Sequence, residues 1–239
     1  MPLFSILLPS LRPDYAENAI RQVLMCSVGQ DYELIVISPF EVGGDRIRHV
    51  PEVEPQGDSA AFHAGLQVAS GKIVVPMIDD FAPAYGWLDR IEEAVDVHER
   101  RALPFCGSLY WVNHPWFNTA YDLYHPFFPV MSRRSIDRIG EYIDRRFRTH
   151  FGDVDLGLRI WSDGGRCALL TEAPIYKARP ELDDRQSPLK KLTVQSDFDA
   201  LVARWHDRYG RGRGRGFNDI VAVRDIGELT DPRWFTPPP

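Results

Sequence analysis

The order of strands and helices in the N-terminal half is the feature that most limits how this chain can fold. Residues 4–9 form a short apolar run closed by proline, residues 16–24 carry apolar side chains at helical spacing, and residues 33–37 form a second apolar run. A strand, a helix and a strand in this order join two parallel strands through a right-handed crossover. The sequence therefore predicts an α/β fold built on a mostly parallel sheet.

The same alternation continues along the chain. Asp14 and Glu17 have the spacing of a capping box, so Asp14 is expected to cap the first helix. Pro83 is expected to begin a later helix. The remaining pattern predicts a weak strand at 47–50, a helix at 59–69, a strand at 72–77, helices at 87–98, 153–161 and 198–209, and a strand at 167–170.

Composition excludes several classes of protein. The chain has 239 residues and a formal net charge of −6, so a general role in coating nucleic acid is not expected. Three widely separated cysteines argue against a disulfide framework or a zinc site and are typical of a reducing compartment. No apolar run approaches the roughly 18 residues that cross a bilayer, and the N-terminus lacks a signal-peptide pattern. We therefore expect a cytoplasmic protein, with peripheral membrane attachment left open.

Two acidic clusters carry most of the functional information. Asp79 and Asp80 directly follow the apolar run 72–77, and Asp153 and Asp155 open a helical pattern. Carboxylates at the carboxyl end of a buried strand lie where open α/β sheets bind ligands. Such oxygens bind hard divalent cations, and a second carboxylate at the same place can act as a general base. The clusters indicate a metal-assisted transferase, and a turn or helix-cap role for either one stays open.

Several short segments, taken in order, match a known family. They are residues 5–10 (SILLPS), 33–37 (ELIVI), 61–65 (AFHAG), 71–80 (GKIVVPMIDD), 83–88 (PAYGWL) and 152–159 (GDVDLGLR). By these segments the chain resembles glycosyltransferases of the GT-A fold, and among them family 2. The resemblance covers roughly residues 3–175 and rests on the combined order and spacing of the motifs.

The resemblance implies both a fold and a chemistry. The fold is a GT-A-type, Rossmann-like α/β fold with a mixed, mostly parallel sheet flanked by helices. Residues 1–175 would form the nucleotide-sugar-binding and catalytic domain, and residues 176–239 a C-terminal extension with one helix and a flexible Arg-Gly segment, packed on the same domain. The chemistry is inverting transfer of a sugar from a nucleotide-diphosphate donor, with a UDP-sugar favoured, to a glycan, lipid-linked or other hydroxyl acceptor. The cofactor would be Mn²⁺ or Mg²⁺.

The resemblance also assigns roles to individual residues. Asp79 and Asp80 correspond to the family's Asp-x-Asp metal motif, with Asp80 favoured as the ligand, and Asp153 corresponds to the catalytic base. The nucleotide-sugar site is expected to include Pro9, Ser10, Arg12, Ser38, Asp58 and His63. Apart from the resemblance, the residue types and their settings make His125, Asp155 and Arg133 candidates for contacts to the acceptor or the diphosphate.

Asp153 and Asp155 are two residues apart and cannot share one helical face. We therefore expect one of them to face the ligand, and the other to cap the helix or to pair with a neighbour such as Arg159.

Three positions depart from the family pattern. Ser38-Pro39 stand where acidic residues usually lie near the nucleobase, Phe62-His63 stand where Arg-Asn often precedes Ala-Gly, and Phe81 takes the place of a third carboxylate. These departures leave open the base, the sugar, and which of the paired aspartates binds metal.

Two other functions remain open at the level of the sequence. A nucleotidyltransferase shares the layout and the metal, but it usually has a glycine-rich basic loop where this chain has Ser10–Pro13. The second is a catalytically silent nucleotide-sugar- or RNA-binding protein. The Arg-Gly run at 210–216 would suit RNA binding, a lid over a diphosphate or a plain linker. The acidic composition favours no nucleic-acid partner.

Overall fold

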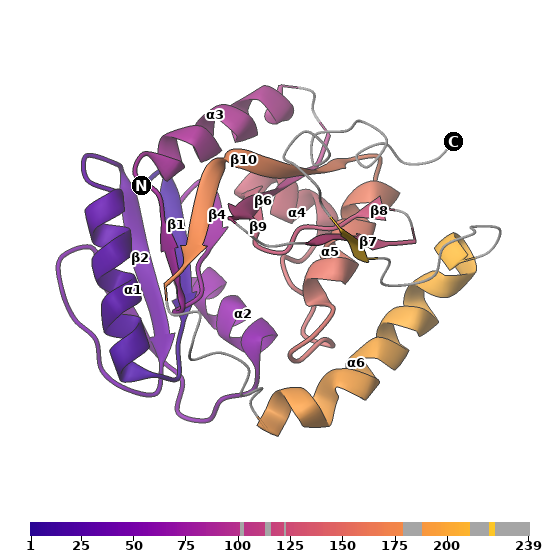
Figure 1. Ribbon diagram of the computed structural model, residues 1–239, viewed down its shortest axis with the longest axis horizontal. Coiled ribbons are helices and arrows are strands. Elements are labelled where there is room, and N and C mark those ends of the chain that lie inside the picture. The colour runs from indigo at the N-terminus through magenta and orange to yellow at the C-terminus, as the bar shows by residue number, and fades with distance from the viewer. Residues whose placement is uncertain (101–102, 113–115, 122, 179–187, 211–219, 223–239) are drawn as a thin grey trace.

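A mixed sheet forms the centre of the molecule (Figure 1). The computed structural model describes residues 1–100, 103–112, 116–121, 123–178, 188–210 and 220–222. Within these residues the main sheet has eight strands in the order β3-β2-β1-β4-β9-β6-β10-β5. Their bounds are β1 Phe4–Pro9, β2 Tyr32–Ser38, β3 Ile47–Pro51, β4 Ile73–Pro76, β5 Phe81–Pro83, β6 Phe105–Trp111, β9 Pro129–Ser132 and β10 Arg166–Lys177.

The strand directions divide this sheet into two parts. Strands β3, β2, β1 and β4 are all parallel, as the N-terminal alternation predicts. Strand β9 is antiparallel to β4 and β6, whereas β6 and β10 are parallel and β5 pairs antiparallel with β10 at the edge. A smaller sheet joins β7 (Trp116–Ala120), β8 (Leu123–Tyr124) and β11 (Ile220–Ala222). The predicted mixed α/β fold is confirmed.

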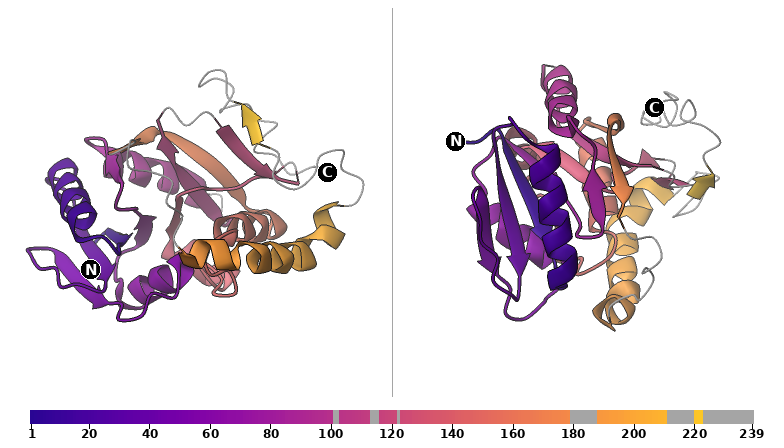
Figure 2. Two further views of the ribbon diagram at one scale, coloured as in Figure 1. Left: turned by 60° about the horizontal axis from the view of Figure 1, so that its bottom comes forward. Right: turned by 60° about the vertical axis from the view of Figure 1, so that its left-hand side comes forward.

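Helices cover both faces of the main sheet (Figures 1 and 2). Helices α1 (Pro13–Cys26) and α3 (Trp87–Glu99) pack on one face, and α2 (Asp58–Val68), α4 (Arg133–Ile139) and α5 (Gly152–Ser162) on the other. Along β1, Leu7 faces the second group, while Ile6 and Leu8 face the first. All three are fully buried, which contributes about 1.5–3 kcal/mol for each side chain. Because successive side chains of β1 point to opposite faces of the sheet, this one strand packs against both layers of helices.

Two predicted helix starts are wrong. The N-cap of α1 is Arg12 rather than Asp14, and no side chain caps this end. Pro13 occupies the first turn, where its missing N–H costs nothing, so the helix begins two residues earlier than the capping box predicts. Pro83 ends strand β5 instead of opening a helix, because it pairs with Ile175 of β10. The helix begins at Trp87, after Gly86 turns the chain with a φ of 72°.

The aromatic middle of the chain forms core strands that the sequence pattern did not resolve. Strand β6 supplies Phe105, and the segment around β8 supplies Tyr121, Tyr124 and Phe128, each at most 3% exposed. Strand β9 then inserts between β4 and β6. These aromatic side chains therefore pack in the core.

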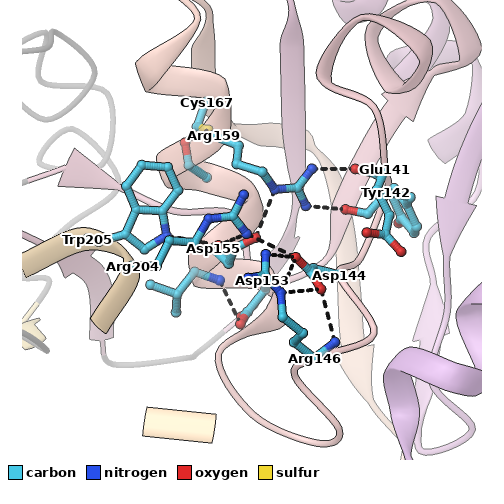
Figure 3. Close-up of polar contacts among 12 residues, drawn as sticks. Glu141, Tyr142, Asp144, Arg146, Asp153, Asp155, Arg159, Cys167, Arg204 and Trp205 are labelled. Atoms are coloured by element: carbon cyan, nitrogen blue, oxygen red, sulfur yellow. Dashed lines mark hydrogen bonds and ion pairs between the residues drawn. The ribbon is translucent and has the colours of Figure 1, made fainter. Parts of the chain in front are cut away.

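Helix α6 (Pro188–Trp205), followed by one π-helical turn at His206–Gly210, lies beside α5 and is joined to it by buried charges (Figures 1 and 3). Asp155 of α5 is fully buried. It accepts hydrogen bonds from Arg159 Nε at 2.8 Å and from Trp205 Nε1 at 2.8 Å, and Arg204 Nη1 lies 3.0 Å from its Oδ1. One carboxylate therefore ties the two helices together.

Asp144, which precedes α5, extends this network to the surface. Arg204 Nη1 lies 2.9 Å from Asp144 Oδ2, and Arg146 donates to the same carboxylate. Burial alone would raise the pKa of Asp144, but hydrogen bonds from Arg146 and the charges of Arg146 and Arg204 lower it to about 2. Asp144 is therefore ionised at neutral pH.

The first prediction concerns the stability of the α5–α6 contact. Asp155→Ala leaves the buried Arg159 guanidinium without its carboxylate, so we expect the free energy of unfolding to fall by roughly 3–5 kcal/mol. Urea denaturation at pH 7 measures the loss. The matched control is Asp163→Ala, which removes the exposed pair with Arg138 and should cost no more than about 1 kcal/mol. Equal effects of the two substitutions would contradict the assigned role of Asp155.

Candidate functional site

The carboxyl ends of β1 and β4 meet at one edge of the sheet, where they bring Ser10 and Asp79 together. Ser10 Oγ donates to Asp79 Oδ2 at 2.5 Å, and Arg12 Nε donates to the same oxygen at 3.1 Å. Arg12 Nη2 donates to Asp79 Oδ1. The guanidinium also lies 3.7 Å from the centroid of the Tyr15 ring. Both oxygens of Asp79 are therefore engaged by the loop that follows β1.

Asp80 lies next to this pair in a different environment. Its Oδ1 is buried and has no hydrogen-bond partner. Burial and the charge of Asp79 raise the pKa of Asp80, against smaller opposing effects of Arg12 and Lys177. A buried, unsatisfied carboxylate oxygen is costly unless a cation or a donor completes it. Asp80 is thus better suited than Asp79 to hold a bound cation.

Phe81 explains why the acidic cluster stops after two residues. Its side chain is 4% exposed and packs edge-on against Trp111 and Phe128, with ring centroids 5.0 Å apart in both cases. A carboxylate at this position would be buried among aromatic rings without a partner. The position belongs to the core, so the metal motif of the resemblance is shortened here for a packing reason.

The residues present fit a cation site with few protein ligands. Among the described residues no group of three or more His, Cys, Asp or Glu side chains is placed to hold a metal. Mg²⁺ is commonly bound through one or two carboxylates together with the phosphates of a substrate. The buried oxygen of Asp80 is compatible with that sparse arrangement and not with an all-protein cage.

Pro9 and Ser38 lie at the ends of the neighbouring strands β1 and β2. Pro9 is the last residue of β1 and is paired with Ile37. Ser38 is fully buried; its Oγ donates to the Phe40 carbonyl at 2.7 Å and lies 3.2 Å from His49 Nε2. At the position where the resemblance expects acidic residues near a nucleobase, the structure has a serine with two neighbouring partners.

The predicted residues Asp58 and His63 both lie on α2, which follows β3 at the same edge of the sheet. Asp58 Oδ2 is 3.0 Å from Lys190 Nζ of α6, and its side chain is half exposed. His63 is partly buried one turn further along the helix. The start of α2, with Asp58, therefore lies at the carboxyl edge of the sheet.

Asp153 lies in the first turn of α5, and its carboxyl is the predicted base. Its Oδ1 accepts from the Val154 N–H at 2.9 Å, and 26% of its side chain is exposed. Burial raises the pKa of Asp153 to about 6, against smaller opposing hydrogen bonds from Val154 and its own backbone, and the charge of Asp58 adds the smallest of these effects. A carboxylate with a pKa near the working pH is suited to accept a proton.

The backbone before Asp153 is held in place by two distant segments. The N–H groups of Thr149 and His150 both donate to Asp197 Oδ2 of α6, each at 3.0 Å. Gly57 packs against the Arg148 carbonyl so closely that a Cβ there would lie 2.2 Å from its oxygen. Phe151 follows with a φ of 63°, a left-handed conformation that is uncommon for a bulky residue and often marks a functional site.

The two acidic clusters lie toward the same edge of the sheet. Helix α5 returns to β10 through a short turn at 163–165, so its N-terminus points toward the carboxyl end of β10. That end of β10 pairs with β5, where Lys177 faces Phe81 and the Ala178 N–H donates to the Asp80 carbonyl at 2.7 Å. The charge of Asp58 at the start of α2 also reaches Asp153. The topology therefore directs the segments that carry Asp80 and Asp153 toward the same edge of the sheet.

Two predicted contact residues lie elsewhere. Asp155 is fully buried against Arg159 and α6, so it does not face a ligand; the expectation that one of the two aspartates would pair with Arg159 is met by Asp155. Arg133 donates to the carbonyls of Ala69 and Gly71, in the segment that leads into β4. Because Asp79 and Asp80 follow the other end of β4, Arg133 lies at the opposite edge of the sheet.

His125, the remaining predicted contact, lies beside Asp153. Its side chain is 6% exposed, and its Nδ1 is buried, makes no hydrogen bond and lies 3.9 Å from Asp153 Oδ2. Burial lowers the pKa of His125 to about 4, against a smaller opposing effect of the Pro126 backbone. The imidazole is therefore neutral at physiological pH.

Lys177 and Asp197 are site residues that the sequence pattern did not reveal. Lys177 ends a strand, and its charge acts on Asp80 only because β10 folds back beside β5. Asp197 is 2% exposed and reaches the loop before α5 from α6. Asp197 has no local sequence signal. For Lys177 the local signal is weak: it is a charged residue at the end of an alternating strand.

The fold was compared with known proteins. Neither a scan against protein-family models nor a sequence search among curated proteins gave a match. Among solved structures, GalNAc-T7, crystallised with UDP, GalNAc and Mn²⁺, gives a TM-score of 0.64 at 11% identity over 88% of this chain and 49% of that chain. S. aureus TarS 1–349 gives 0.54 at 12% identity over 86% and 73% of the two chains, and S. aureus TarS gives 0.56 at 12% identity over 84% and 44%.

The chain has the GT-A fold. GalNAc-T7 and TarS are both GT-A-fold glycosyltransferases, and the similarity to them extends over most of this chain at 11–12% identity. The chain spans about half the length of GalNAc-T7. The fold inferred from the sequence resemblance is thus confirmed.

The second prediction concerns the cost of keeping Asp153 charged. Because folding raises the pKa of Asp153 from 3.8 to about 6, its ionised form destabilises the native state above pH 4, and this penalty grows until about pH 6. Asp153→Asn should therefore raise the free energy of unfolding at pH 8 by on the order of 2–3 kcal/mol. Urea denaturation of the parent and variant from pH 4 to 8 measures the difference. No gain at pH 8 would mean that Asp153 is solvated like a surface carboxylate.

Proposed function

We propose that this chain is a metal-dependent, inverting glycosyltransferase that moves a sugar from a nucleotide-diphosphate donor, a UDP-sugar by preference, to a hydroxyl group of a glycan acceptor. The observation that carries the proposal is the contrast between two carboxylates at one edge of a GT-A fold. Asp80 has a buried oxygen without a partner, and Asp153 has a pKa near 6. Carboxylates whose environments separate them in this way take different roles in catalysis.

Asp80 would hold the divalent cation, which we take to be Mn²⁺ or Mg²⁺. When bound, the cation would neutralise the charge that develops on the diphosphate leaving group. Arg12 and Lys177, the two cations whose charges act on Asp80, would orient the diphosphate. Asp79 would keep the loop after β1 in place through Ser10 and Arg12, and this loop together with Pro9, Ser38, Asp58 and His63 would contact the nucleotide sugar.

Asp153 would act as the general base. It would take the proton from the acceptor hydroxyl as the acceptor oxygen attacks the anomeric carbon of the donor from the face opposite the diphosphate. The bond between that carbon and the diphosphate oxygen breaks, and its electron pair leaves with the diphosphate. The raised pKa of Asp153 allows the carboxylate to accept this proton near neutral pH.

The C-terminal part is included in the proposal. We keep residues 1–175 as the catalytic domain and 176–239 as an extension, and contacts of α6 with α5 support their packing as one body. The Arg-Gly segment at 211–216 lies outside the described residues, so its proposed role near the diphosphate stays a prediction. In the described part of the chain, no helix combines the length and apolarity that a membrane crossing requires. The cytoplasmic location, peripheral membrane attachment and lipid-linked acceptors also stay predictions.

The third prediction tests donor and metal binding. Isothermal titration with UDP should show an affinity that rises when Mn²⁺ is added, and Asp80→Asn should remove most of that gain, with a loss of more than about tenfold in affinity. The control is Asp96→Asn on the exposed side of α3, which should bind UDP and Mn²⁺ like the parent. Binding of RNA by the parent protein without binding of any nucleotide sugar would overturn the transferase proposal.

The fourth prediction separates binding from chemistry. Asp153→Asn should bind UDP and Mn²⁺ normally but lose roughly 10²–10⁴-fold in the rate of sugar transfer, since the general base is removed. Release of UDP from a set of UDP-sugars, measured with and without acceptor sugars, gives the rate and identifies the donor. A variant that keeps the parental rate would show that Asp153 is not the base. Transfer of the nucleotide rather than the sugar would favour a nucleotidyltransferase.

A further inference from the structure

The surroundings of Asp153 contain one buried polar atom that the proposed mechanism does not yet use. His125 Nδ1 has no hydrogen bond although its side chain is almost fully buried, and the polar atom it faces is Asp153 Oδ2 at 3.9 Å. Buried polar atoms normally have hydrogen-bond partners, because a buried group without one loses its hydrogen bonds to water and gains none in exchange. Asp153 Oδ1 accepts from Val154, so Oδ2 is the oxygen directed toward the imidazole.

The position of His125 is set by one face of α5. Asp153, Gly157 and Trp161 follow each other at four-residue spacing and so lie along a single side of the helix. Trp161 Nε1 donates to the Tyr124 carbonyl at 2.7 Å, which fixes the backbone next to His125. At Gly157 a Cβ would lie 2.8 Å from the His125 Cβ and 3.1 Å from its Cα. The helix therefore has a glycine where His125 packs against it, one turn from the Asp153 carboxyl.

We propose that His125 is a positioning residue for Asp153: its Nδ1 accepts a hydrogen bond from the Asp153 carboxyl after that carboxyl has taken the acceptor's proton. The proposal rests on the function proposed above. At 3.9 Å the two atoms are too far apart for a hydrogen bond, and the ionised carboxylate has no proton to donate. Once Oδ2 carries a proton, a small rotation of the side chain closes the contact and satisfies the imidazole.

The contact favours the protonated form of the base. A hydrogen bond made only by the neutral carboxyl raises its pKa, since it stabilises the state that the reaction produces. His125 is neutral at physiological pH, because burial lowers its own pKa to about 4, and it can therefore serve as an acceptor. No proton needs to pass to the imidazole. The proton stays on Asp153 Oδ2 and returns to solvent when the product leaves.

Other titratable groups also act on Asp153 and must be separated from His125. Asp58 of α2 raises the pKa of Asp153 by its charge. Cys106 of β6 and Tyr124 of β8 interact with Asp153 as well, but burial raises the pKa of both groups, so they stay neutral between pH 5 and 8. The charge of Asp58 is the same in the parent and in a variant that alters only His125, so its effect on the pKa of Asp153 cancels in the comparison.

The test is a titration of Asp153 by NMR of protein labelled with ¹³C at aspartate carboxyls, in the absence of donor and acceptor. The signal is assigned by its loss in Asp153→Asn. In His125→Phe the ring keeps water out but offers no acceptor, so the pKa of Asp153 should fall by roughly one pH unit. His98→Phe replaces a histidine that stacks on Phe105 at the other face of the sheet, and it should leave the titration unchanged. A rise, or no change, in His125→Phe would overturn the proposal.

A second variant covers the case in which His125→Phe does not fold. Gly157→Ala keeps both His125 and Asp153 but forces the imidazole away from the helix, so it should lower the pKa of Asp153 in the same direction. In the transfer assay, the acid limb of the profile of kcat/KM against pH should move to lower pH by the same amount in either variant. If the pKa of Asp153 falls in the variants but the parent protein transfers no sugar, the His125 contact is supported and the proposed function is rejected. An unshifted titration in an active Gly157→Ala enzyme would reject the contact alone.

Discussion

The buried charges between α5 and α6 are the constraint on which the candidate site depends. Asp155 has no exposed surface, and a lone charge there would be far too costly, so Arg159, Arg204 and Trp205 must all lie around it. Two residues before Asp155 stands Asp153. Any motion that separated α6 from α5 would leave the Asp155 carboxylate without its partners on α6. Because Asp153 lies in the same helical turn as Asp155, the network also restrains the proposed base.

The four aspartates of the two acidic clusters show how different the surroundings of one residue type can be. Asp79 accepts hydrogen bonds from Ser10 and Arg12, and Asp80 has a buried oxygen without a partner. Burial raises the pKa of Asp153 to about 6, and Asp155 forms a buried ion pair with Arg159. The side chains are chemically identical. Their properties differ because the neighbouring charges and the degree of burial differ, and the proposed function rests on that difference.

Much of the fold could be predicted because its signals are local. Apolar runs and helical spacing identified β1, α1, β2, β4 and α5, and the acidic pairs at the end of β4 and the start of α5 marked the site. Contacts between distant segments could not be predicted. The insertion of β9 between β4 and β6 is one example, and the turn of Arg133 toward the carbonyls of Ala69 and Gly71 is another. Each depends on how segments pack after they have formed.

The sequence by itself determined the order of strands and helices and the presence of carboxylates at two element ends, since both follow from spacing along the chain. Only the tertiary structure decided the surroundings of each carboxylate. The ring of Phe81 lies in the core at the position where the resemblance expects a third carboxylate, and Asp155 points toward α6. His125 packs against Gly157 and lies beside Asp153. The physical reason is that burial, charge pairing and orphaned polar atoms are properties of surroundings. Those surroundings are assembled from segments far apart in the chain.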